Sequence, residues 1–305
     1  MPRDRAWWRE GAELLSPTQR LGTFDWVVKI AGSMSPLVVQ IGAHDHDNNE
    51  VGRIKSNDHD PAVLAIKHGW RALLLEPMPD AFARLRSRYE SAAPRVRCLQ
   101  AASCGTDADA CTGTSLHRTI YSVDVTNATG NWGSQHADTR CIVRSTKQAG
   151  LSSQWLAQTA SLSRTHLLRQ GTVFHRTPWQ CARCTERLGH PLPPDCLRHV
   201  VGRNLITQRV PCACLSRILP TDQPAFDSVQ LLVVDAEGHD GAVLHAWPFD
   251  RARPWRIAFE AAHLKASEYY ALARHLQALG YRCMHWCSPR ADITSWHHLN
   301  SSERV

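Results

Sequence analysis

Two carboxylates and an imidazole follow one apolar segment of the sequence. Residues 229–234 are almost entirely apolar and predict a buried strand, and Asp235, Glu237 and His239 come directly after it. In an open parallel sheet, ligands bind beyond the carboxyl ends of the strands. A carboxylate or a neutral imidazole in that place can take a proton from a bound substrate as a general base. Asp235 is the first candidate for this role because the strand holds it, with Glu237 second and His239 third.

The same three residues also have a structural explanation. A helix is expected over residues 239–247, and carboxylates near a helix N-terminus are stabilised by the helix dipole. Asp235 or Glu237 could cap that helix through a side-chain hydrogen bond. Helical periodicity could also turn His239 away from a ligand site. A catalytic role and a capping role therefore both stay open.

Two other strand ends carry residues suited to a nucleotide-like cofactor. The strand expected over residues 37–41 ends at Gly42, which lets the backbone turn sharply and approach a ligand closely. The strand expected over residues 72–75 ends at Glu76, whose carboxylate can accept both hydroxyl hydrogens of a ribose. A full G-x-G-x-x-G motif is absent because His44 stands at its second glycine position, and Glu76 follows Gly42 by more than the usual spacing of about 20 residues. The pattern alone leaves NAD and S-adenosylmethionine open.

These strand ends belong to an alternating pattern of strands and helices. The first half predicts strands over 37–41, 72–75 and 96–101 and helices over 61–68 and 79–90. The second half predicts strands over 229–234, 256–259 and 281–286 and helices over 239–247 and 268–279. Alternation of this kind indicates a parallel sheet with right-handed crossovers. Asp60 and Pro61 are a typical helix start, and Gly69 a typical helix end. We interpret the middle, about 105–205, as strands of the same sheet interrupted by a large insertion.

Several of these segments resemble the motifs of FkbM-family methyltransferases. The resembling segments are Val39–Asp45, Asn57-Asp58, Gly69–Pro79 followed by Phe82, Leu85 and Tyr89, Gln100–Ala102, Val210–Cys212 with Leu215 and Leu219, Asp235–Asp240, Phe259-Glu260 with His263-Leu264, and Gly280-Tyr281. They cover about 37–101 and 205–285 in the order that the family has. His46 stands where the family commonly has glycine, and Asp240 replaces the usual glutamate.

The resemblance implies a class I methyltransferase fold, which is α/β and Rossmann-like. Its seven-stranded, mostly parallel sheet has one antiparallel strand near its edge and flanking helices, here with a cysteine-containing insertion. We expect a lead-in over 1–36, a methyltransferase domain over 37–290 with the insertion at about 105–205, and a tail over 291–305.

The resemblance also implies S-adenosylmethionine as cofactor and O-methylation of a hydroxyl on a small molecule or glycan. The cofactor-binding residues that it implies are Gln40, Gly42, Ala43, His44, Asp45, Glu76, Ala102 and Ser103. Glu76 would bind the ribose, and the adenine would lie near Ala102 and Ser103.

Two other functions stay open. The first is a catalytically inactive methyltransferase-like protein whose insertion binds a partner, although the intact Gly42, Glu76 and Asp235 pattern argues against it. The second is a nucleic-acid methyltransferase, which only the formal charge of +7 supports. The basic residues are scattered, as on a solvated surface, and no Asn-Pro-Pro-Tyr motif for base methylation is present.

The chain has eleven cysteines, an odd number, and reduced thiols are the default expectation. Cys181, Cys184 and Cys196, with a nearby histidine, could hold a structural zinc, but we favour unliganded thiols and expect no metal. Cys98 and Cys283 stand in strand-like runs and would act as small core hydrophobes. No apolar run approaches the roughly 18 residues of a membrane span, and no secretory signal is recognised, so we expect a cytoplasmic location.

Overall fold

The computed structural model describes most of the predicted domain. The described residues are 36–44, 60–104, 117–123, 141, 160–173, 177–192, 196, 198, 202, 205–219, 229–285, 287–289 and 294–298. The expectations for Asp45, for Asn57-Asp58, for the lead-in over 1–35 and for most of the tail lie outside these residues.

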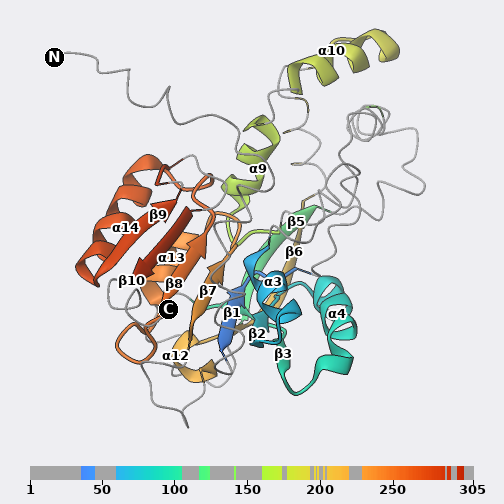
Figure 1. Ribbon diagram of the computed structural model, residues 1–305. Coiled ribbons are helices and arrows are strands. Elements are labelled where there is room, and N and C mark those ends of the chain that lie inside the picture. Colours follow the sequence, from blue (N-terminus) through green and yellow to red (C-terminus); the bar gives the residue numbers. More distant parts are fainter. Residues whose placement is uncertain are drawn as a thin grey trace, which may run out of the picture.

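The centre of the molecule is a seven-stranded, mostly parallel sheet (Figure 1). In spatial order its strands are β3 (Val96–Leu99), β2 (Arg71–Leu75), β1 (Leu37–Ile41), β7 (Leu231–Val234), β8 (Arg256–Phe259), β10 (Thr294–His298) and β9 (Tyr281–His285). β10 pairs antiparallel with both β8 and β9, whereas β3, β2, β1, β7 and β8 pair parallel. The predicted class I methyltransferase fold is confirmed. β10 was not predicted: it lies within the stretch that the sequence assigned to a tail.

The register of the parallel strands places the predicted site residues side by side. Ile41 of β1 pairs with Leu75 of β2 on one side and with Val234 of β7 on the other. Val234 in turn pairs with Phe259 of β8. The residues that follow these four positions therefore leave the sheet at one level, on the edge where ligands bind in open parallel sheets.

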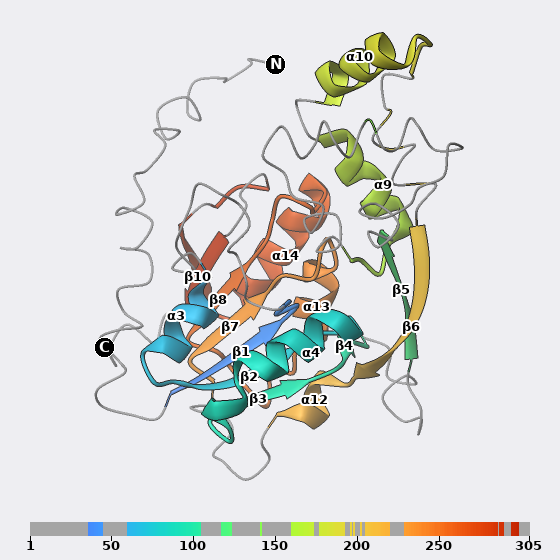
Figure 2. The ribbon, with the colours of Figure 1, turned by 90° about the vertical axis from the view of Figure 1, so that its right-hand side faces the viewer.

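Helices cover both faces of the sheet (Figure 2). On one face, Val39 and its neighbours pack against α12 (Leu215–Ile218), α13 (Asp240–Ala246) and α14 (Ala266–Ala278). On the other face, Val38 and its neighbours pack against α3 (Pro61–Lys67) and α4 (Pro79–Arg88), which the short 3-10 helix η3 (Glu90–Ala92) follows. Side chains alternate between the faces of a strand, so β1, which is buried throughout and apolar apart from Gln40, contributes to two cores.

The start of α3 is the one predicted from the sequence. Oδ1 of Asp60 accepts hydrogen bonds from the backbone N–H groups of Ala62 (2.7 Å) and Val63 (3.2 Å), and Pro61 takes the first helical position. Gly69 follows the helix with a φ of 86°, a left-handed conformation that glycine adopts without strain. The cap matters for the site because it holds the Asp60 side chain beside the carboxyl end of β1.

Among the described residues, the middle of the chain adds no strand to the central sheet, so that part of the prediction is wrong. Its strands form a separate sheet in the order β4 (Ala102–Ser103), β6 (Leu205–Ala213) and β5 (His117–Val123). The insertion also contains α9 (Arg164–Val173) and α10 (Thr177–Leu188), which Figure 1 shows beyond the end of this sheet. Only Val210 is fully buried in β6, so β6 lacks the apolar run by which a buried strand is recognised.

Most of the described cysteines are disulfide-bonded, so the expectation of reduced thiols is also wrong. Disulfides join Cys104 to Cys212, Cys141 to Cys184, Cys181 to Cys196 and Cys283 to Cys287. Their Cα–Cα distances of 5.2–5.9 Å lie in the usual range. Cys181, Cys184 and Cys196 are therefore not available as thiolate ligands for zinc. Cys283 is disulfide-bonded as well and is not a core thiol. Cys98 is a free, half-buried thiol.

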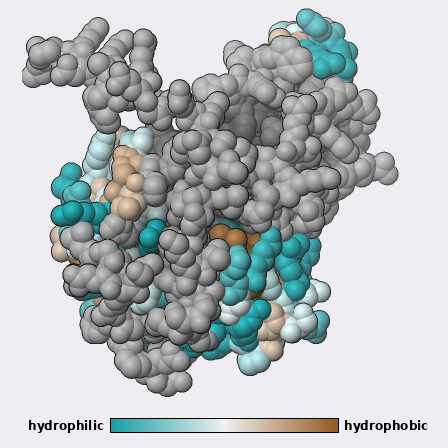
Figure 3. All heavy atoms as spheres, in the orientation of Figure 1, coloured by the Kyte–Doolittle hydropathy of each residue, from teal (hydrophilic) through white to brown (hydrophobic). Residues whose placement is uncertain are grey.

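Three arginines of one predicted helix lie on the outer surface. Arg84, Arg86 and Arg88 are exposed on α4. On the face drawn in Figure 3, hydrophilic residues cover this helix. This agrees with the interpretation of the positive charge as a solvated surface. Among the helices that the structure describes, none has the length and apolar character needed to cross a membrane.

We predict that the disulfide between Cys104 and Cys212 contributes strongly to stability. It closes a sequence separation of 108 residues and ties β4 to β6. The double variant Cys104→Ala/Cys212→Ala should lose about 2–5 kcal/mol of unfolding free energy, because a long loop is no longer closed in the unfolded chain. Denaturant unfolding under non-reducing conditions measures this. Cys98→Ala is the control and should cost much less; equal losses in the two variants would contradict the assignment.

Candidate functional site

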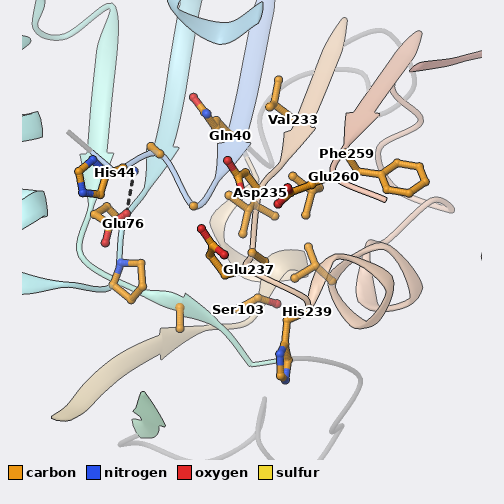
Figure 4. Close-up of a pocket in the computed structure, with 18 of the residues that line it drawn as sticks. Gln40, His44, Glu76, Ser103, Val233, Asp235, Glu237, His239, Phe259 and Glu260 are labelled. Carbon is orange, nitrogen blue, oxygen red and sulfur yellow. Dashed lines mark hydrogen bonds between the residues drawn. The ribbon is translucent and has the colours of Figure 1, made fainter. Parts of the chain in front are cut away.

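A cavity of about 430 Å³ opens at the carboxyl ends of β1, β2, β7 and β8 (Figure 4). The predicted site residues that line it are Gln40, Gly42, Ala43, His44, Glu76, Ala102, Ser103, Asp235, Glu237 and His239. Asp45 is the one predicted site residue outside the described part of the chain. The structure thus brings together residues from four separate stretches of the sequence.

Gly42 fixes the floor of this cavity. Its φ is 82°, and a Cβ atom at this position would overlap the backbone carbonyl oxygen of Asp235. The N–H groups of Gly42 and Ala43 both donate to the carbonyl of Leu75, at 3.0 and 2.9 Å. The loop after β1 therefore lies flat against the ends of β2 and β7, and only glycine permits that approach.

Glu76 is held in one orientation by the backbone. Its Oε2 accepts a hydrogen bond from the N–H of His44 at 2.7 Å, drawn as a dashed line in Figure 4, and its Oε1 accepts one from the N–H of Met78 at 2.8 Å. The residue is only 4% exposed. A carboxylate can accept about four hydrogen bonds, and that of Glu76 lines the cavity. The geometry suits a pair of ligand hydroxyls.

Gln40 and Asp60 form a second polar group on the cavity wall. Nε2 of Gln40 donates to Oδ2 of Asp60 at 3.0 Å, while Oδ1 of Asp60 caps α3. Gln40 is buried, and the strand β1 holds it. The amide of Gln40 is thus oriented by a carboxylate that is itself fixed to a helix.

The opposite wall of the cavity is apolar. Ala102 of β4 packs in one cluster with Ile120 of β5, and Met78 and Leu162 lie against that cluster. All four line the cavity, and Ser103 follows Ala102 at its edge. An apolar wall with a nearby hydroxyl suits an aromatic ring system.

Three carboxylates converge at the end of β7 and β8. In Figure 4 the carboxylates of Asp235, Glu237 and Glu260 point toward one another. Asp235 is accessible from the cavity, but protein atoms surround it on its other sides. This burial raises the pKa of Asp235 well above its usual range, and the neighbouring charges of Glu237 and Glu260 raise it further. A carboxyl group with a raised pKa is a stronger base than an ordinary aspartate.

Asp240, the first residue of α13, holds the turn before the helix, and the N-cap residue His239 makes no side-chain cap hydrogen bond. Asp240 is fully buried, and its carboxylate accepts from the N–H groups of Ala236 (3.4 Å) and Gly238 (3.2 Å). Burial, and then the charge of Glu260, raise the pKa of Asp240 to about 7. The carboxylate of Asp240 therefore stabilises the turn after β7. The side chains of Asp235 and Glu237 remain directed at the cavity.

His239 lines the cavity but does not join the three carboxylates. Its imidazole points away from them in Figure 4. Burial lowers the pKa of His239, and the nearby His166 and Arg118 lower it further. Its Nδ1 atom has no hydrogen-bond partner within the described residues. The arrangement leaves His239 neutral and separates it from the candidate base Asp235.

The sequence analysis did not assign three residues of this site. Glu260 follows β8 directly, as Asp235 follows β7, so the same strand-end rule could have found it. His263 comes three residues later, and its Nε2 lies 3.1 Å from Oε1 of Glu260. Burial opposes a charged His263, but the hydrogen bond and charge of Glu260 outweigh it and raise the pKa of His263. His166 comes from α9 of the insertion, where no local pattern marks it.

The cavity is acidic in a protein that is basic as a whole. Its lining includes five carboxylates, those of Asp60, Glu76, Asp235, Glu237 and Glu260. Among the described lining residues there is no lysine or arginine. Clefts lined by one sign of charge concentrate the opposite sign. The cavity therefore favours a ligand that carries positive charge over a phosphate-bearing one.

Comparison with known proteins gives the family. No curated protein matches the chain in a sequence search. The protein-family comparison matches residues 40–283 to the methyltransferase FkbM domain. That range includes every strand of the parallel part of the central sheet, apart from the first residues of β1, and all the cavity residues named above. The chain therefore belongs to the FkbM methyltransferase family.

Proposed function

We propose that this methyltransferase binds S-adenosylmethionine in the cavity and transfers its methyl group to a hydroxyl of a small molecule or glycan. The observation that carries the proposal is the placement of Gly42, Glu76 and Asp235 side by side at the mouth of one acidic cavity. The family membership supports methyl transfer as the reaction.

The residues of the cavity fit this cofactor. Its sulfonium is a cation, which the carboxylates of the cavity attract. Glu76, oriented by two backbone N–H groups, suits the two hydroxyls of a ribose. The apolar wall around Ala102 and Met78 suits the adenine. NAD, the alternative that the pattern left open, carries a pyrophosphate, and an acidic cavity disfavours it.

The chain's own groups can align the acceptor and remove its proton. When bound, S-adenosylmethionine supplies an electrophilic methyl group and leaves as a neutral thioether. The acceptor oxygen forms the new bond to the methyl carbon while the bond from that carbon to sulfur breaks and its electron pair stays on sulfur. In this proposal Asp235 accepts the hydroxyl proton. Burial, and then the negative charges of Glu237 and Glu260, raise the pKa of Asp235. A positioned base of this kind contributes about 10²–10⁴-fold to a rate.

The acceptor that we propose is uncharged or cationic. A nucleic acid would bring phosphates to a mouth lined by carboxylates, and no observation at the site favours that alternative. Incubation with methyl-labelled cofactor and a metabolite extract, followed by identification of the labelled product, tests the proposal. Binding of the cofactor without transfer to any hydroxyl compound would favour the catalytically inactive alternative.

The disulfides bear on where the enzyme works. The sequence analysis expected a cytoplasmic location and reduced thiols, whereas eight of the described cysteines form four disulfides with one another. Disulfides persist in oxidising environments and are rare in the cytosol. We therefore propose an oxidising compartment instead.

Glu76→Gln tests the cofactor site. We expect S-adenosylmethionine and its demethylated product to raise the melting temperature of the wild type, since both bind the native state. The variant should bind them about 10–100-fold more weakly, because charge-assisted hydrogen bonds of ~1.5–3 kcal/mol are lost. Calorimetry measures this. Glu90→Gln, an exposed position in η3, is the matched control. Unchanged affinity in a folded Glu76→Gln protein would exclude the assignment.

Asp235→Asn tests the base. We expect methyl transfer per folded molecule to fall by about 10²-fold or more, with cofactor affinity changed only a few-fold. The reason is that the amide cannot accept the hydroxyl proton, while the contacts of Gly42 and Glu76 persist. Asp250→Asn, an exposed position, is the control and should keep full activity. A variant with lowered stability but wild-type turnover per folded molecule would show that Asp235 is structural.

A further inference from the structure

Two histidines and two glutamates meet at the edge of the cavity. His166 comes from α9 of the insertion, Glu237 from the turn after β7, and Glu260 and His263 from the segment after β8. Nε2 of His166 lies 3.7 Å from Oε2 of Glu237, and Nε2 of His263 lies 3.8 Å from the same oxygen. Oε1 of Glu260 lies 3.1 Å from Nε2 of His263. The cluster thus offers two imidazole nitrogens and two carboxylate oxygens.

These separations suit a single metal ion. Ligand atoms of His166, Glu237 and His263 all lie within 4.8 Å of one another. With metal–ligand bonds of about 2.0–2.2 Å, two ligands of a tetrahedral site lie about 3.4 Å apart. Small movements of the two imidazole rings reach that geometry. The side chains are only 11% exposed for His166 and 22% for Glu237, so the cluster is largely shielded.

The insertion is fitted to the turn after β7 so that His166 lies beside Glu237. Gly238 has a φ of 86°, and a Cβ atom there would collide with the His166 ring. Oγ of Ser161 donates a hydrogen bond to the carbonyl of Glu237 at 2.8 Å. Oγ of Ser163 accepts from the N–H of His166 at 3.2 Å. Three independent contacts therefore set this imidazole against this carboxylate.

The negative charge of the carboxylates at this cluster also favours a bound cation. Asp235, Glu237 and Glu260 converge, and the described lining of the cavity has no lysine or arginine to balance them. We propose that His166, Glu237 and His263, with Glu260, bind a divalent first-row transition metal ion. Imidazole nitrogen with carboxylate oxygen suits Zn²⁺, Mn²⁺ or Fe²⁺, whereas Mg²⁺ and Ca²⁺ prefer oxygen ligands alone.

The ion would act on the methyl acceptor. A hydroxyl bound to a divalent metal loses its proton more readily, because the cation stabilises the developing alkoxide. The metal would thus place the acceptor oxygen at the cavity mouth, and Asp235 would take the proton. This role depends on the proposed methyl transfer, whereas the binding of the metal does not.

Metal titration of the untagged full-length protein tests the site. After removal of metals with a chelator, the wild type should take up one Zn²⁺ or Mn²⁺ per chain, measured by calorimetry and by elemental analysis. His166→Ala and His263→Ala should each weaken that binding by at least about 100-fold. His275→Ala removes a histidine that instead lies against His245 on α13 and should bind as the wild type does. A melting curve of each variant establishes that it is folded.

Several outcomes would overturn the metal site. If the cluster is only an ion-pair network of protonated histidines, the wild type and His166→Ala will take up equally little metal. An equal loss in His275→Ala would show that binding is not at this cluster. Separate titration with S-adenosylmethionine distinguishes the two proposals. A wild type that binds the cofactor but no metal overturns the metal site alone, whereas one that binds metal but no cofactor supports the metal site and overturns the proposed function.

Discussion

The close approach of Gly42 to the backbone of Asp235 is the constraint on which the site depends. β1 lies between β2 and β7, and Ile41 pairs with Leu75 and with Val234, so the loops after these strands begin at one level. There is room for that arrangement only because position 42 has no side chain. A shift of β1 by one residue would exchange its two faces and put another residue at this contact. The register that directs the side chains of β1 into the two cores therefore also shapes the cavity.

This geometry concentrates negative charge in a chain whose formal charge is +7. Burial, and then the charges of neighbouring carboxylates, raise the pKa of both Asp235 and Asp240. Their repulsion opposes folding, and Asp240 offsets it in part by accepting two backbone N–H groups. A cationic ligand attracts each of these carboxylates and so offsets the remaining repulsion between them. Ligand binding and the stability of this region are for that reason linked.

The insertion is part of the site. Its strands β5 and β6 form a separate sheet with β4, and that sheet supplies the apolar wall of the cavity. Within this sheet, the disulfide between Cys104 and Cys212 ties β4 to β6. Ser161 and His166 then reach the turn after β7. The insertion, whose sequence shows no clear strand or helix pattern, thus completes a cavity formed at the ends of the parallel strands.

The sequence by itself determined the parallel sheet, the capped start of α3 and the strand-end positions of Gly42, Glu76 and Asp235. Apolar runs that end in glycine or an acidic residue are local patterns, and the pairing rules of parallel sheets extend them to a fold. Only the tertiary structure decided which distant residues meet. No periodicity places His166 beside Glu237, because a folded insertion must bring them together. Which cysteines pair, which strands form the second sheet and where β10 lies depend in the same way on contacts between residues far apart in the chain.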